Sequence, residues 1–357
     1  MNLFHYEPLD RNSNQIRLLR FSDQLNSQRG YVLDSFDLNE CPLYEALSYT
    51  WEPPLPTSII TLNKESFEIR QNLADFLVHF RIGITLLDEN DSPLYHPKYL
   101  WIDQLCINQS SEQEKTHQVK RMAEIYKQAQ RVVAWLGPCG EQSYRGMRLI
   151  ADNRFVGKLP NDNYPSTFSG INLWRAMDKE QQEYLNRLLK NRRSVENMLR
   201  KPYRDRLWIV QEFVLARDIV FACGPFAVTL AAIWTLRFIS DVPRWFKSCG
   251  RQVGFVSIPE PVRNVLHERI PRIYKTTFSS PEARLYKLLA DFSTRKCGGP
   301  RDKVYGLLAL CQGKVDIIID YSKPADVIFC ELSTPLSSFK GCREKWLLQL
   351  ARDMGVK

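Results

Sequence analysis

Short apolar runs alternate with amphipathic stretches through the first two thirds of the chain. Residues 43–51, 99–107 and 131–136 are almost continuously apolar and end near proline, glycine or polar turn residues. Such runs are typical of strands buried on both faces. Residues 72–80 and 112–129 instead carry apolar side chains at helical spacing. Strands separated by helices with short connections predict an α/β fold with a mostly parallel sheet and right-handed crossovers.

The chain on either side of this alternation has a different pattern. Residues 1–42 predict a strand-rich entry to a unit that covers 43–224. Within that unit, residues 139–200 combine a polar loop with a charged amphipathic helix, which indicates a large insertion. Residues 225–357 predict a mainly helical C-terminal part packed on the core, with a further strand over 315–321.

The stretch 201–224 predicts a turn, a helix and a buried strand. Pro202 and Asp205 favour the turn, since proline fixes its own φ and aspartate is a common helix N-cap. In the helix, Trp208 and Glu212 are four residues apart and share one face. A ring and a carboxylate beside a basic run are suited to hold a nucleotide-like ligand. A core tryptophan with a surface glutamate has the same spacing, and spacing alone leaves both interpretations open.

Polar and aromatic residues in the first two apolar runs are further candidates for ligand contact. Ser48, Tyr49 and Trp51 come at the C-terminal end of the first run, where ligands meet an open α/β sheet. Asp103 lies inside the second run. A carboxylate there must be hydrogen-bonded or face a ligand, because burying it bare is costly. A structural role and a ligand-binding role for Asp103 both remain open.

Composition and charge narrow the class of protein. The 357 residues are 44% hydrophobic and 25% charged, which is typical of a globular chain with a sizeable core. A net charge of +9 raises the question of nucleic acid, but the excess is dispersed except for a basic cluster over 187–206. A solvated helix face explains that cluster, as does an anionic ligand near Trp208 and Glu212. We therefore do not expect nucleic acid as a partner.

Cysteine and histidine usage points away from metal sites and disulfides. The nine cysteines form no C-x-x-C pair and the five histidines form no cluster, so we predict no metal and no resident cofactor. Free cysteines in apolar runs are typical of a reducing compartment. No stretch of about 18 uncharged apolar residues predicts a membrane span. We expect a cytoplasmic protein.

Three blocks of the sequence, in this order, carry a family resemblance. They are YEALSYTW at 44–51, LWIDQLCINQ at 100–109 and RLWIVQE at 206–212. They resemble the fungal heterokaryon incompatibility (HET) domain. PRDKVYGLL at 300–308 and DYSKP at 320–324 also resemble segments that follow this domain in family members. The resemblance implies a fungal protein of non-self recognition whose HET domain triggers programmed cell death.

HET domains are in turn distantly similar to TIR domains, which implies a TIR-like, flavodoxin-like core. Ser48-Tyr49 at a strand end and Trp208 four residues before Glu212 fit the TIR pattern. TIR enzymes use that glutamate to cleave NAD between nicotinamide and ribose, so NAD would be a substrate. By analogy Glu212 would stabilise the oxocarbenium-like transition state. Trp208 or Tyr49 would pack against a ring, and Arg206 would meet the pyrophosphate.

Two functions follow from the resemblance. The first is NAD hydrolysis by a cell-death effector. The second is a non-enzymatic signalling module that acts by self-association or by binding a partner, such as a separate sensor protein. The predicted site has Glu212 as its catalytic residue, and its ligand-binding residues are Ser48, Tyr49, Trp51, Asp103, Arg206 and Trp208.

Overall fold

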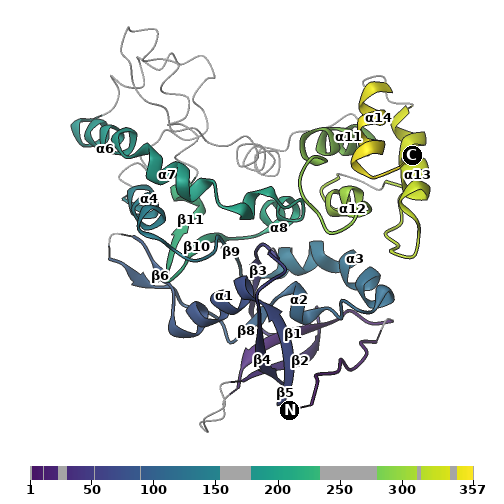
Figure 1. Cartoon of the computed structure of the whole chain (residues 1–357), viewed down its shortest axis with the longest axis horizontal. Coiled ribbons are helices and arrows are strands. Elements are labelled where there is room, and N and C mark those ends of the chain that lie inside the picture. Colours follow the sequence, from purple (N-terminus) through teal and green to yellow (C-terminus); the bar gives the residue numbers. More distant parts are fainter. Residues whose placement is uncertain are drawn as a thin grey trace.

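A computed structural model of the chain shows one large sheet with helices around it (Figure 1). In the described part of the chain the sheet has eleven strands, in the order β5-β4-β2-β1-β8-β3-β9-β10-β11-β6-β7. The structure describes residues 2–10, 12–22, 30–51, 53–88, 90–152, 178–233, 280–311, 315–337 and 344–356.

Four neighbouring strands at the centre of the sheet are parallel. They are β8 (Tyr99–Trp101), β3 (Tyr44–Ser48), β9 (Arg131–Trp135) and β10 (Ile219–Cys223). Every residue of β3 and β10 is buried, which explains their unbroken apolar runs. Numbered in chain order, these strands lie 2-1-3-4, the order with which flavodoxin-like sheets begin.

Hairpins extend the sheet on both sides of this parallel centre. On one side, β1 (Gln15–Phe21) pairs antiparallel with β2 (Tyr31–Asp37) and with β8. Beyond them lies the antiparallel pair of β4 (Thr57–Leu62) and β5 (Glu65–Arg70). On the other side, β11 pairs antiparallel with β10, and β6 pairs antiparallel with β7. These last strands are Phe226–Thr229, Thr85–Leu86 and Ser92–Pro93.

The prediction of a mostly parallel sheet is therefore wrong. More positions of the sheet pair antiparallel than parallel. The apolar runs identify the doubly buried centre correctly, but half-buried strands of alternating pattern do not reveal which sheet they join. The strands of the N-terminal entry join the same sheet as the core, through β1 and β8.

Helices occupy the connections between the central strands. α1 (Gln71–Ile82) lies between β3 and β8, and α2 (Asp103–Cys106) and α3 (Glu112–Gln128) lie between β8 and β9. Five described elements lie between β9 and β10. In chain order they are α4 (Glu141–Ala151), α6 (Lys179–Lys190), α7 (Arg192–Leu199), the 3-10 turn η1 (Pro202–Asp205) and α8 (Ile209–Leu215). The predicted polar loop within 139–200 lies outside the described residues.

The described C-terminal part is helical and groups beside α8 and α3 (Figure 1). It contains α11 (Pro281–Phe292), α12 (Asp302–Leu308), α13 (Ala325–Ser337) and α14 (Glu344–Asp353). The strand predicted over 315–321 is wrong, since these residues form no strand. No helix in the described ranges combines the length and apolarity needed to cross a membrane.

A buried ion pair fastens the N-terminal strand to the core. Ser111 begins α3 as the sequence pattern predicts, because its Oγ accepts the Glu114 backbone N–H at 3.2 Å. The Glu114 carboxylate, however, turns to Arg17 on β1, with Nη1 to Oε1 at 2.6 Å and Nη2 to Oε2 at 3.1 Å. Arg17 also donates to the carbonyl oxygens of Glu7 and Cys106. One guanidinium thus connects β1, the N-terminal segment, α2 and α3.

We expect Arg17→Ala to lower the free energy of unfolding by about 3–5 kcal/mol, because the charged Glu114 carboxylate stays buried without its cationic partner. Urea denaturation measures this difference. Arg20→Ala on the same strand is the matched control, since its partner Asp34 is partly exposed. The control should cost no more than about 1 kcal/mol. Equal losses for the two variants would contradict a structural role for the buried pair.

Candidate functional site

The turn before α8 positions the residues of the predicted ligand site. Pro202 opens η1, where a missing backbone N–H costs no helical hydrogen bond. The following residues are extended because they pair with the C-terminal part. The Leu207 N–H donates to the Lys296 carbonyl at 2.8 Å, and the Lys296 N–H donates to the Asp205 carbonyl at 2.7 Å. The helix therefore starts only at Ile209, with Trp208 at its N-cap.

Glu212 of α8 is fully buried, and its carboxylate contacts Ser48, the last residue of the central strand β3. The Ser48 hydroxyl donates to Glu212 Oε2 and also contacts the Tyr203 hydroxyl, with 2.7 Å between the two oxygens. The other carboxylate oxygen, Oε1, is buried without a hydrogen-bond partner. The interpretation of Glu212 as a surface glutamate beside a core tryptophan is therefore wrong for the glutamate. Trp208 itself is 8% exposed.

Burial raises the pKa of Glu212 to about 7. The charge of Asp103 raises it further, whereas the Arg206 guanidinium and the hydrogen bond from Ser48 lower it. A carboxyl group with this pKa exchanges its proton near neutral pH. Both its ionised and its neutral form are then available to chemistry or to a conformational change.

Asp103 has the structural role that the sequence left open, and it also lies at a cavity. The strand predicted over 99–107 ends at Trp101, and Asp103 is the first residue of α2. Its carboxylate accepts the Gln104 backbone N–H at 2.8 Å and the Trp51 indole N–H at 3.0 Å. Burial raises its pKa, and Arg206, with Nη2 3.6 Å from Asp103 Oδ2, opposes that shift. Asp103 also lines a cavity.

The cavity lies between the core and the C-terminal part and has a volume of about 360 Å³. A volume of this size is typical of sites for small molecules. The predicted residues Trp51, Asp103, Arg206 and Trp208 line it. The other lining residues are Thr50, Arg70, Ile107, Gln109, Lys115, Val119, Met122, Pro202, Asp205, Lys296, Cys297, Gly298, Asp302 and Tyr321.

The predicted site is thus divided into two layers. Ser48, Tyr49 and Glu212 do not line the cavity and are at most 1% exposed. Arg206 connects the layers. One of its nitrogens donates to the Tyr49 carbonyl oxygen, and its guanidinium interacts with the charges of Glu212 and Asp103, which raise its pKa against the effect of burial. A ligand in the cavity would meet Arg206 before it met Glu212.

Several cavity residues were not predicted from the sequence, notably Arg70, Lys115, Lys296 and Tyr321. Lys115 is one of several polar residues on the amphipathic helix α3, so its position in the sequence does not distinguish it from residues of the solvent-facing side. Lys296 and Tyr321 come from the C-terminal part, whose path back to the core depends on tertiary contacts. The segments PRDKVYGLL and DYSKP pointed to this region through their family resemblance, but not to these side chains.

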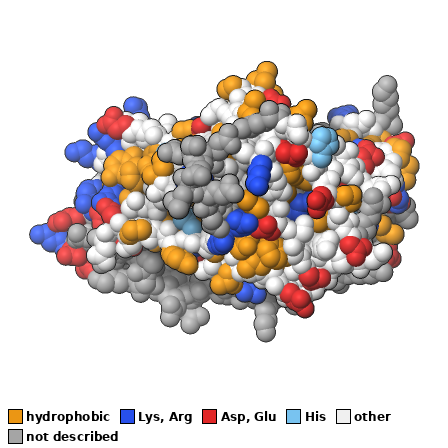
Figure 2. Space-filling model, turned by 90° about the horizontal axis from the view of Figure 1, so that it is seen from below, with side chains coloured by type: hydrophobic (Ala, Val, Ile, Leu, Met, Phe, Trp, Pro, Cys, Tyr) orange, Lys and Arg blue, Asp and Glu red, His pale blue; other side chains and the backbone are white. Residues whose placement is uncertain are grey.

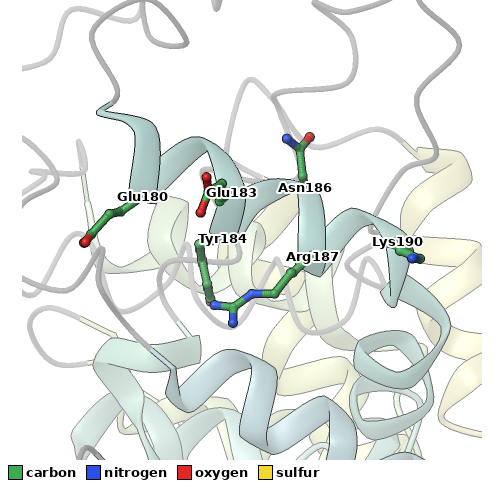
Figure 3. Close-up of a pocket in the computed structure, with 6 residues that line it drawn as sticks. All are labelled: Glu180, Glu183, Tyr184, Asn186, Arg187 and Lys190. Atoms are coloured by element: carbon green, nitrogen blue, oxygen red, sulfur yellow. The ribbon is translucent and has the colours of Figure 1, made fainter.

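A second hollow, of about 500 Å³, lies along α6 (Figure 3). Its lining residues all belong to that one helix, and none is a predicted site residue. They are Glu180, Glu183, Tyr184, Asn186, Arg187 and Lys190.

Within the described ranges, no three or more His, Cys, Asp or Glu side chains are grouped to hold a metal ion. On the face shown in Figure 2, basic and acidic side chains are interspersed.

Comparison with known proteins agrees with the family resemblance. Residues 44–212 match the family model described as heterokaryon incompatibility protein (HET). The chain is also 28% identical to heterokaryon incompatibility protein 6, OR allele, of Neurospora crassa, over 87% of this chain and 49% of the relative. The chain therefore spans about half the length of that curated relative. No solved structure matches the chain. These matches support the HET family, and they do not extend to a similarity with TIR domains.

The raised pKa of Glu212 predicts a pH-dependent stability. The folded state keeps the proton that the unfolded state releases above its ordinary pKa of 4.5. Proton binding by Glu212 therefore stabilises the folded state fully below pH 4.5. The free energy of unfolding falls by roughly 3 kcal/mol as pH rises to about 7 and this contribution is lost. Glu212→Gln keeps an acceptor for Ser48 but cannot ionise, so it should gain stability over wild type between pH 5 and pH 8.

Urea denaturation of both proteins at these two pH values measures the difference. The matched variant Ser48→Ala removes a hydrogen bond that lowers the pKa of Glu212. The pKa of Glu212 should therefore be higher in this variant, and the fall in its free energy of unfolding should continue to a higher pH than in wild type. A difference between wild type and Glu212→Gln that stays constant from pH 5 to pH 8 would contradict the buried, proton-exchanging carboxyl group.

Proposed function

We propose that this chain acts in fungal heterokaryon incompatibility, as an effector of programmed cell death in non-self recognition. The match of residues 44–212 to the HET family supports this role. So does the similarity to a Neurospora crassa protein that is named for heterokaryon incompatibility. As the chain spans half of that relative, the role assigned here is that of the HET-domain part.

For the mechanism, we propose hydrolysis of NAD or a related nucleotide on a TIR-like core. One observation carries the proposal: a buried carboxyl group with a pKa of about 7 is hydrogen-bonded to the last residue of the central parallel strand, next to a cavity. The 2-1-3-4 order of the parallel strands is consistent with such a core, and ligands bind at the carboxyl ends of strands in such sheets.

In this reaction the bond between nicotinamide and ribose breaks, and its electron pair leaves with nicotinamide. The ionised Glu212 carboxylate stabilises the positive charge on the ribose, and water adds at the same carbon and loses a proton. Arg206 would hold the pyrophosphate, and Trp51 or Trp208 would pack against a ring. Because Glu212 is covered, the substrate must displace the Arg206 side chain to reach it.

A second candidate function is a signalling module that acts by self-association or by binding a separate sensor protein. The complete burial of Glu212 favours it, since the carboxylate already bonds Ser48 and does not line the cavity. In this function Glu212 joins α8 to β3, and no substrate needs to reach it.

Incubation of the purified protein with NAD, followed by chromatography of released nicotinamide, distinguishes the two functions. The hydrolase proposal predicts release that falls at least about 100-fold in Glu212→Gln, because the charge that stabilises the transition state is lost. Release should rise as pH increases through about 7, since the ionised form of Glu212 is required. Glu124→Gln, on the exposed face of α3, is the matched control and should leave release unchanged.

Circular dichroism verifies that each variant is folded. If folded wild-type protein releases no nicotinamide at any concentration, the hydrolase mechanism is excluded. Concentration-dependent assembly in size-exclusion chromatography would then support the signalling module.

A further inference from the structure

Part of the cavity wall comes from outside the matched family segment. Lys296, Cys297, Gly298, Asp302 and Tyr321 belong to the C-terminal part and line the cavity together with Lys115 of α3. The site therefore combines residues of the matched segment with residues of the C-terminal part.

This wall is held rigidly by the segment CGGPRD over residues 297–302. The Asp302 carboxylate accepts the Gly299 N–H at 3.0 Å and the Tyr321 hydroxyl at 2.5 Å. The Tyr321 N–H in turn donates to the hydroxyl of Thr116 on α3 at 3.2 Å. The loop, Tyr321 and α3 are thus fixed to one another before any ligand binds, which lowers the entropic cost of binding.

The same wall is fixed to the segment that carries Arg206. The backbone of Lys296 pairs with Asp205 and Leu207 on either side of Arg206. Gly306 of α12 lies against the Trp208 indole, where an added Cβ would already be in contact at 3.5 Å. The C-terminal part therefore positions Arg206 and Trp208 and contributes Lys296 to the same cavity.

The charges around the cavity favour an anion. Four basic side chains line it: Arg70, Lys115, Arg206 and Lys296. Lys115 lies 4.3 Å from the centre of the Tyr321 ring, and Arg70 lies 5.5 Å from that of Trp51. Neither forms a salt bridge with a carboxylate of the described residues. Three acidic side chains also line the cavity, those of Asp103, Asp205 and Asp302, so the basic groups exceed the acidic ones by one. Donors from the protein already bond the carboxylates of Asp103 and Asp302.

We propose that Lys115 and Lys296 form a phosphate-binding subsite in this cavity and that its ligand is a nucleotide bound through its phosphate groups. A volume of about 360 Å³ exceeds the needs of a lone phosphate ion, and two indole rings line the same space. The choice of a nucleotide rests on the proposed function. The subsite itself rests on the presence of both lysines in the lining of one cavity.

Isothermal titration calorimetry of the full chain with ADP-ribose, NAD and adenosine tests the subsite. We expect wild-type protein to bind ADP-ribose and NAD, and Lys115→Gln and Lys296→Gln each to bind them roughly tenfold more weakly. Adenosine has no phosphate, so these substitutions should not change its binding. Lys115→Arg keeps the charge and should retain most of the affinity for ADP-ribose.

Lys127→Gln is the matched control, because this lysine is exposed on α3 and does not line the cavity. An equal loss for Lys127→Gln and Lys115→Gln would indicate general charge attraction and overturn the subsite. Absence of binding by wild type to ADP-ribose and NAD would also overturn it. Binding that depends on Lys115 and Lys296 without release of nicotinamide would keep the subsite and exclude only the hydrolase mechanism.

Discussion

The hydrogen bond between Ser48 and the carboxyl group of Glu212 is the interaction on which the centre of the structure depends. It connects the last residue of the central strand to the helix that leads into the next parallel strand. A carboxyl group is costly to bury, and here one of its oxygens has a donor and the other has none. The protein meets this cost partly by holding the proton, which is why the pKa of Glu212 reaches about 7.

Around this carboxyl group the structure forms a chain of charges that leads to the cavity. Arg206 interacts with both Glu212 and Asp103, and Asp103 accepts the indole N–H of Trp51 at the surface of the cavity. A ligand that draws Arg206 away would remove a charge that lowers the pKa of Glu212. Such a ligand would couple occupancy of the cavity to protonation of the buried carboxyl group through one guanidinium.

The C-terminal part completes this arrangement because its backbone pairs with the segment on either side of Arg206. The family match ends at Glu212, yet the cavity beside that residue has Lys296 and Tyr321 in its wall. The elements that carry the family blocks and those that follow them thus share one site.

The apolar runs located the central parallel strands, because strands buried on both faces are almost continuously apolar. The run at 99–107 is nevertheless a strand only as far as Trp101 and a helix from Asp103. The spacing of Trp208 and Glu212, and the position of Ser48 at a strand end, also indicated which side chains would be close to one another. Tertiary structure decided what local pattern cannot encode. The hairpins make most pairs of the sheet antiparallel. The sequence did not show this, because an alternating apolar and polar pattern does not reveal which strand is the partner. The pairing of Leu207 with Lys296 leaves α8 to begin at Ile209 and places Lys296 at the cavity that Lys115 of α3 also lines. Glu212, which the sequence left open as a surface carboxylate, is buried, and burial raises its pKa to about 7. Sequence could not show this, because a pKa depends on the surrounding atoms rather than on the neighbours in the chain.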